Sequence, residues 1–105
     1  MSDDSPLVKL ILCFDIRPGV QQVYYQFMLG QYIPAVQKMG LQMSDAWHLA
    51  YGNYPSRITS FVGLNLQTMH NVLSSSEWQE MEKRLQKYVS NYSWRIIPLR
   101  EGFQL

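Results

Sequence analysis

The stretch that decides the fold is residues 74–99, SSSEWQEMEKRLQKYVSNYSWRIIPL. Ser76 stands three residues before Gln79, which is the spacing of a capping box at the start of a helix. Apolar residues then recur at helical spacing: Trp78, Met81, Leu85, Tyr88 and Val89. Residues 92–99 alternate with a period of two, as a strand does. The stretch therefore predicts a capped amphipathic helix that leads directly into a strand.

The first half of the chain shows the same two signals in the opposite order. Residues 7–16, LVKLILCFDI, alternate strongly and predict a strand with one apolar face. Residues 20 to about 39 follow helical spacing, and Pro34 predicts a kink or break near Gln31 because proline removes a helical hydrogen bond. Gly40 is a natural C-terminal cap for this helix.

Two further strands lie between these units. Residues 41–52 and residues 57–64 predict strands, and the GNYPS turn between them predicts a hairpin. Asn65 can cap a short helix that ends at about residue 73. The resulting order is β-α-β, hairpin, α-β, the ferredoxin-like pattern. We expect an α+β βαββαβ fold with a four-stranded antiparallel sheet and two helices on one face.

Length and composition exclude several classes of protein. A length of 105 residues predicts one domain, which we place over residues 7–105. We expect residues 1–6 to be a disordered N-terminal segment. A net charge of +1 predicts neither nucleic-acid nor membrane binding. A single cysteine, Cys13, excludes an internal disulfide and a multi-cysteine metal site. The acidic start MSDDSP does not resemble a signal peptide, so we expect a cytoplasmic protein.

Strand alternation predicts two unlike faces of the sheet. The predicted helix-facing side is apolar: Val8, Leu10, Leu12, Phe14, Ile16, Met43, Trp47, Leu49, Tyr51, Ile58, Val62, Leu64, Trp94 and Ile96. The predicted open side mixes Ile11, Cys13, Phe61, Ile97 and Leu99 with Lys9, Asp15, His48, Arg57, Thr59 and Arg95. An apolar centre with charged edges suits a second sheet packed on this side. We therefore expect a homodimer formed through the open sheet face, with a monomer as the alternative.

Three segments carry a family resemblance. They are the helix end from Pro34 to Gly40 running into residues 41–52, the turn WHLAYGNYP, and SSEWQEMEKRLQKYV running into the last strand. With them, residues 7–105 resemble the dimeric α/β-barrel superfamily, which includes antibiotic-biosynthesis-type monooxygenases, NIPSNAP proteins and stress-responsive barrel proteins. The SEW start of the last helix is particularly similar to NIPSNAP-type members. These segments are signatures of a fold, and a fold shared by many functions does not define chemistry.

The resemblance implies a small-molecule pocket between the helices and the sheet of each subunit. Its candidate lining is Tyr24, Tyr32, Asp45, Trp47, Tyr51, Ser60, His70 and Trp94, of which we assign ligand binding to Tyr24, Tyr32, Trp47, Tyr51, His70 and Trp94. The alternative is that these aromatic residues fill the core, which is favoured for Trp47 and Trp94. Asp45 is expected at the wet edge of its strand unless a bulge shifts the register.

The sequence identifies no catalytic residue. His48 and His70 are the only histidines, and two isolated histidines do not form a metal site. We therefore predict no metal and no cofactor, and the Asn/Trp/His set of the haem-degrading branch has no match. Three functions stay open: a homodimer that binds a small, partly aromatic molecule; a cofactor-independent monooxygenase acting on an aromatic or quinone-type substrate; and a structural or interaction module.

Overall fold

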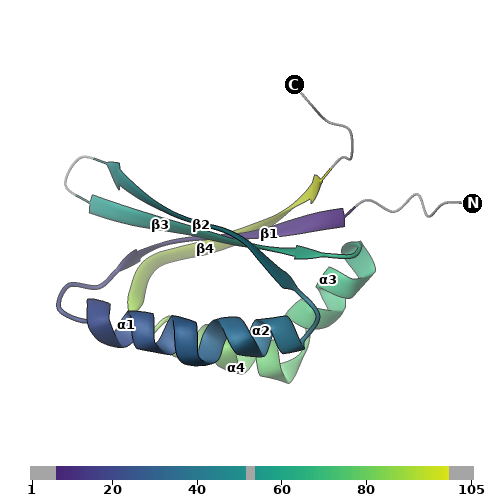
Figure 1. Cartoon of the computed structure of the whole chain (residues 1–105), viewed down its shortest axis with the longest axis horizontal. Coiled ribbons are helices and arrows are strands. Elements are labelled where there is room, and N and C mark those ends of the chain that lie inside the picture. Colours follow the sequence, from purple (N-terminus) through teal and green to yellow (C-terminus); the bar gives the residue numbers. More distant parts are fainter. Residues whose placement is uncertain (1–6, 52–53, 100–105) are drawn as a thin grey trace, which may run out of the picture.

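A computed structural model describes residues 7–51 and 54–99. Four strands, β1 (Leu7–Ile16), β2 (Gln42–Tyr51), β3 (Tyr54–Gly63) and β4 (Val89–Leu99), form one antiparallel sheet in the order β2-β3-β1-β4. The helical segments are α1 (Gln21–Phe27), η1 (Met28–Tyr32), α2 (Ile33–Lys38), α3 (Leu66–Leu73) and α4 (Ser76–Leu85). Figure 1 shows all of them on one side of the sheet. The predicted ferredoxin-like βαββαβ fold is confirmed.

The core lies between the sheet and the helices. Alternate residues of β1 are buried, Leu10 and Leu12 completely, because this strand is central and faces the helices with every second side chain. The buried set also draws on every helical segment, and its largest members are Trp78, Tyr32 and Phe61. Burial of this apolar surface is the main force that holds the two layers together.

The first helix is continuous, but it is not a regular α-helix. Met28–Tyr32 form a π-helical turn, η1, between α1 and α2. The sequence predicts a kink near Gln31, and the structure accommodates Pro34 by widening the turn before it instead. A π turn absorbs one extra residue. Tyr24 and Tyr32, eight positions apart, would lie about 80° apart around a regular α-helix, whereas one absorbed residue reduces this to about 20°. Both side chains are consequently buried against the sheet.

The prediction of which β3 side chains face the helices is wrong. Pairing with β1 places Phe61 opposite Leu10, Thr59 opposite Leu12 and Arg57 opposite Phe14. Phe61 and Thr59 are buried beneath the helices, while Ile58 and Val62 are half-buried on the other side. Both faces of this strand carry apolar residues, so alternation alone could not choose between them.

A β-bulge also overturns the predicted faces of β2. Met43 pairs with Phe61 on the helix side, but the register then shifts, and Asp45 pairs with Ser60 on the open side. One extra residue moves every later position to the opposite face. Trp47 pairs with Ile58, so its position belongs to the open face, and that of His48, opposite Arg57, belongs to the helix side. The side chains of Asp45 and residues 47–55 lie outside the described part.

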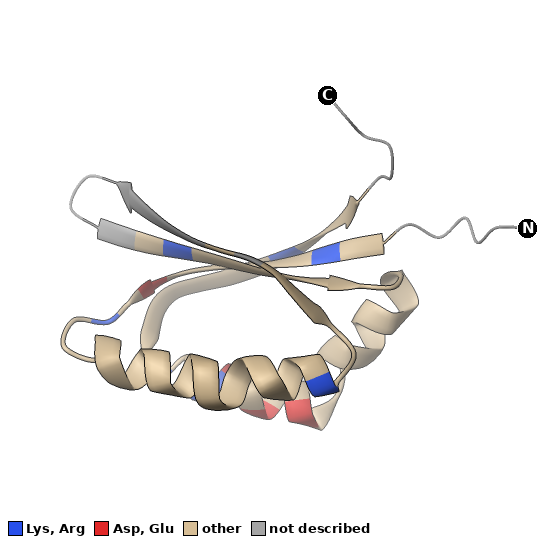
Figure 2. Cartoon of the chain, in the orientation of Figure 1, with Lys and Arg blue, Asp and Glu red and all other residues tan. Residues whose placement is uncertain are grey.

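The open face of the sheet is thus more apolar than its predicted composition. The described half-buried apolar residues at its centre are Ile11, Cys13, Ile58, Val62 and Ile97, and the half-buried Lys9 lies opposite Val62 and Ile97. The few charged residues of the sheet are scattered along its strands (Figure 2). None of the helical segments in the described ranges covers this side (Figure 1).

The boundaries of α4 differ from the prediction at both ends. Its cap is Ser75, whose Oγ accepts a hydrogen bond from the Trp78 amide at 3.1 Å and donates one to the Val72 carbonyl at 2.7 Å. The helix ends at Leu85, and Val89 pairs with Ile16 as the start of β4. A β-branched residue that is fully buried in a strand favours this earlier ending. The predicted cap of α3 is confirmed, since Asn65 Oδ1 accepts from the Thr68 amide at 2.8 Å.

The neighbouring serines provide a matched test of this cap. Ser75→Ala should lower the free energy of unfolding by about 1 kcal/mol, because the first turn of α4 loses its acceptor. Ser76→Ala should leave it nearly unchanged, since Ser76 is exposed inside the helix. Urea unfolding followed by circular dichroism measures both. Equal destabilisation by the two variants, or a larger effect of Ser76→Ala, would contradict the assignment of the cap.

Candidate functional site

A row of polar side chains crosses the layer between the helices and the sheet. Glu82 of α4 receives two hydrogen bonds on the same oxygen, Oε2: one from Tyr92 Oη at 2.9 Å and one from Trp94 Nε1 at 3.1 Å. Trp94 pairs with Leu12 and therefore belongs to the helix side of β4, as predicted. Asn91, with a φ of 54°, forms the bulge that separates Tyr92 from the first residues of the strand.

Tyr32 lies at the centre of this layer. It is completely buried, and its ring packs edge-on or tilted against Phe27, Phe61 and Trp78, with centroids 5.9, 6.1 and 6.0 Å away. Its hydroxyl has no hydrogen-bond partner. A buried hydroxyl without a partner costs stability, and such groups in a native fold call for an explanation.

The electrostatics of the layer keep its tyrosines protonated. Burial raises the pKa of Tyr32 well above its ordinary value, and the negative charge of Glu82 adds to this. Burial also raises the pKa of Tyr24 and of Tyr92, and for Tyr92 the neighbouring Tyr32 and Glu82 act in the same direction. At neutral pH these hydroxyls are hydrogen-bond donors and not bases.

A cation lies at one end of the same layer. Arg57 of β3 donates through Nη2 to the hydroxyl of Tyr25, and its guanidinium stacks over the Tyr25 ring at 5.5 Å. The positive charge of Arg57 acts on the pKa of Tyr24 against the larger effect of burial. The polar groups of the layer therefore include a cation that contacts Tyr25, the buried Tyr32 hydroxyl and the Glu82 carboxylate.

The structure brings three of the six predicted ligand-binding residues to this layer and separates a fourth. Tyr24 and Tyr32 are buried in it, and Trp94 lies at its edge, 42% exposed. His70 is exposed on α3 and lines a different groove, of about 560 Å³, with Val8 and Ile96. The side chains of Trp47 and Tyr51 lie outside the described residues, although the register gives both positions to the open face.

Sequence reasoning missed Glu82, Tyr92 and Arg57. Two of them had a detectable signal. Glu82 is four residues after Trp78, so both lie on the same side of α4, and Tyr92 shares the alternation of Trp94. Arg57 had none, because its face depends on the register of β3 against β1.

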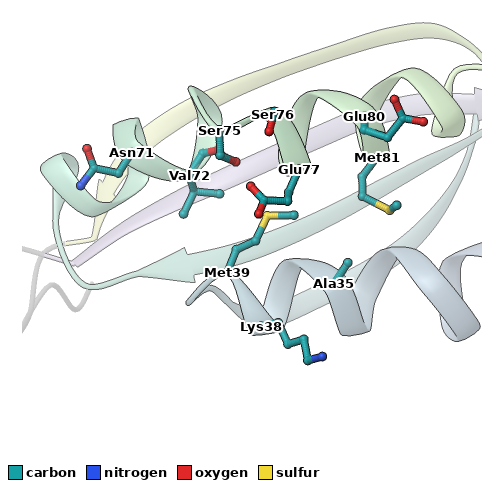
Figure 3. Close-up of a pocket in the computed structure, with 10 residues that line it drawn as sticks. All are labelled: Ala35, Lys38, Met39, Asn71, Val72, Ser75, Ser76, Glu77, Glu80 and Met81. Carbon is teal, nitrogen blue, oxygen red and sulfur yellow. The ribbon is translucent and has the colours of Figure 1, made fainter.

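A second cavity lies in the helical layer, between α2 and the segment of α3 and α4. It measures about 800 Å³, and its lining is Ala35, Lys38, Met39, Asn71, Val72, Ser75, Ser76, Glu77, Glu80 and Met81. Figure 3 shows Met39 and Met81 reaching into the space between the helices, while Lys38 points away from it. Its charged side chains are exposed to solvent. This groove is mainly apolar, and its polar side chains do not converge on one point as they would in a specific binding site.

The described residues form neither a metal site nor a membrane span. Within residues 7–51 and 54–99, no group of three or more histidine, cysteine, aspartate or glutamate side chains is arranged to hold a metal ion. Across the same described ranges, every helix is too short or too polar to cross a membrane.

Comparison with known proteins defines the fold. No family model matches the sequence, and no curated protein matches it significantly. A NIPSNAP family protein from Agrobacterium tumefaciens is similar to this chain with a TM-score of 0.68 and 15% identity, over 98% of this chain and 94% of its own. A NIPSNAP-like domain protein from Burkholderia xenovorans gives 0.69 and 16%, over 96% and 90%.

The same fold occurs in a candidate antibiotic biosynthesis monooxygenase from Nitrosomonas europaea. Its TM-score is 0.70 at 5% identity, over 99% of this chain and 100% of its own. The chain therefore has the fold of the dimeric α/β-barrel superfamily, as the sequence predicts. At such identities the likeness concerns the fold alone, and the function must be argued from the site.

Two tyrosines of the layer should respond oppositely to loss of the hydroxyl. Tyr32→Phe should raise the free energy of unfolding by about 1 kcal/mol, because it removes a buried polar group that has no partner. Tyr92→Phe should lower it by about 1 kcal/mol, because Glu82 loses a donor. Urea unfolding curves measure both. If Tyr32→Phe is destabilising by a similar amount, the Tyr32 hydroxyl has a partner in the folded protein.

Proposed function

We propose that this protein is a homodimer that binds a small, partly aromatic organic molecule between its helices and its sheet. The observation that carries the proposal is the Tyr32 hydroxyl, which is completely buried and lacks a partner. A ligand oxygen that accepts from this hydroxyl would offset the cost of burying it. Phe27, Phe61 and Trp78 pack around the Tyr32 ring, and ligand sites are usually lined by aromatic residues of this kind.

The proposal concerns binding and leaves catalysis aside. The three tyrosines are held protonated, and the Glu82 oxygen in the layer already accepts two hydrogen bonds. These groups can orient a ligand, but they do not present a free base. A monooxygenase acting without a cofactor would need such a base near its substrate. The geometry of the described residues thus supports binding better than the enzymatic alternative.

Dimerisation through the open sheet face is supported by the composition of that face. Ile11, Ile58 and Val62 are half-buried on the side that the described helices leave uncovered. Exposed apolar area of this kind commonly marks an interface between proteins. Two such sheets packed face to face would cover both, as in a two-layer barrel.

The dimer can be tested by light scattering during size exclusion. The wild-type chain should elute with twice its monomer mass at micromolar concentration. Ile11→Lys, at the centre of the open face, should raise the dimer dissociation constant by about tenfold or more. Val23→Lys introduces the same charge on the outer surface of α1, where Val23 is 44% exposed, and should leave the dimer intact. A monomeric wild-type protein would exclude this interface.

Ligand binding can be tested with a neutral aromatic probe that carries hydrogen-bond acceptors. We expect 2-methoxy-1,4-naphthoquinone to quench tryptophan fluorescence saturably, and Tyr32→Phe to weaken its binding by about tenfold, the effect of one buried hydrogen bond. Tyr88→Phe is the control, because Tyr88 packs against Phe27 as Tyr32 does but is not fully buried. Equal affinity in the wild type and Tyr32→Phe would show that the probe does not use the Tyr32 hydroxyl.

A further inference from the structure

Arg57 is placed as a ligand-binding cation. It lies on the helix side of β3, directly opposite Phe14 of β1. Phe14, Tyr24 and Tyr25 form a chain of edge-to-face rings, with centroids 5.8 and 5.0 Å apart. The guanidinium stacks on the last of these rings and donates Nη2 to its hydroxyl. These contacts hold the planar guanidinium in one orientation.

That orientation leaves a buried donor without a partner. Arg57 Nε is buried and has no hydrogen-bond partner. Arginine stays charged at all accessible pH values, so its N–H groups are donors only. A buried N–H group without an acceptor costs stability, and proteins normally pair such a group.

The carboxylates with described hydrogen bonds have other donors. Asp15 accepts from Ser56 Oγ at 2.9 Å and from Asn91 Nδ2 at 2.7 Å, on the open side of the sheet. Glu82 accepts from Tyr92 and Trp94 at the far end of the layer. Among the described side chains, the printed contacts of Arg57 are therefore to the neutral Tyr25 and not to an acid.

The two unused polar atoms of the layer have compatible chemistry. Arg57 Nε–H can only donate, and the Tyr32 hydroxyl, which stays protonated, can also donate. Tyr24 packs against Tyr25, over whose ring the guanidinium lies, and it is buried on the sheet-facing side of the first helix together with Tyr32. A molecule that satisfied both atoms would bring acceptor oxygens, and the one beside a guanidinium would best be charged.

We infer that the ligand of this layer is an aromatic organic anion whose ionised oxygen, a carboxylate or an ionised enol or phenol, accepts a hydrogen bond from Arg57 Nε. This inference rests on the proposed binding function and adds the charge of the ligand and the residue that recognises it. The ring of the ligand packs among the aromatic side chains beside Tyr24, and a second oxygen meets the Tyr32 hydroxyl.

Two naphthoquinones that differ at one oxygen test this inference. At pH 7, 2-hydroxy-1,4-naphthoquinone is an ionised enol, whereas 2-methoxy-1,4-naphthoquinone is neutral and has the same ring system. Titration calorimetry should show that the wild-type protein binds the anion about tenfold more tightly, which corresponds to one charge-assisted hydrogen bond. Arg57→Gln should weaken the binding of the anion only, so that the two quinones bind with nearly equal affinity.

Control variants separate charge recognition from damage to the fold. Arg57→Lys keeps the charge without the fixed fork and should retain part of the preference for the anion. Arg17→Gln removes an exposed arginine whose described hydrogen bond, to the Gln86 carbonyl, is 3.4 Å long, and it should change neither affinity. Circular dichroism spectra of Arg57→Gln and Arg57→Lys should match that of the wild type.

The outcomes distinguish the two proposals. Equal wild-type affinity for both quinones, or a preference for the anion that survives in Arg57→Gln, would overturn the role of Arg57 and leave ligand binding standing. Failure of the wild-type protein to bind either quinone would count against ligand binding and against the role of Arg57 together. Loss of the preference in Arg57→Gln, with Tyr32→Phe weakening both quinones, would support both.

Discussion

The structure depends on the placement of β1 between two strands that pair with it along most of its length. β1 is hydrogen-bonded to β3 on one side and to β4 on the other, and its inward residues Leu10 and Leu12 are completely buried. Because side chains alternate across a strand, this double pairing decides which residues of β3 and β4 meet the helices. It sets Phe61 and Arg57 on the inner side, and it sets Trp94 beside Glu82. The core and the candidate site are both consequences of the same register.

The elements that could be predicted are those whose own sequence carries the necessary contrast. β1 and β4 have one strongly apolar row each, and their predicted faces are correct. β3 carries apolar side chains on both faces, so only its pairing with β1 could settle which of them is inside. The bulge at Ser44 in β2 leaves no mark in the local pattern, and it reverses every position that follows. The sequence therefore could not predict which faces of β2 and β3 are buried, because these faces depend on long-range strand pairing and on a single-residue bulge.

The same limit explains the outcome at the candidate site. Tyr24 could be found because helical spacing places it on the apolar stripe, and Trp94 because strand alternation does. Tyr32 was expected only from the family resemblance, and the π turn brings it to the buried side. Arg57 could not be found, since it becomes an inward cation only through the register of β3. His70 was expected in the same pocket, but the structure separates it, since α3 lies at one end of the sheet in Figure 1. The aromatic residues of the site can thus be predicted in part from the sequence, whereas the position of its charged residue depends on the tertiary structure.

The π turn at Met28–Tyr32 has a consequence for how such a site can be retained. The wide turn absorbs one residue, so Tyr24 and Tyr32, eight positions apart in the sequence, lie about as far apart around the helix as residues seven positions apart in a regular α-helix. Loss of a single codon within η1 would restore a regular α-helix, and the two tyrosines, then seven positions apart, would still lie about 20° apart around it. A protein with this fold could therefore gain or lose one residue in its first helix while both tyrosines keep facing the sheet, because the π turn takes up the difference.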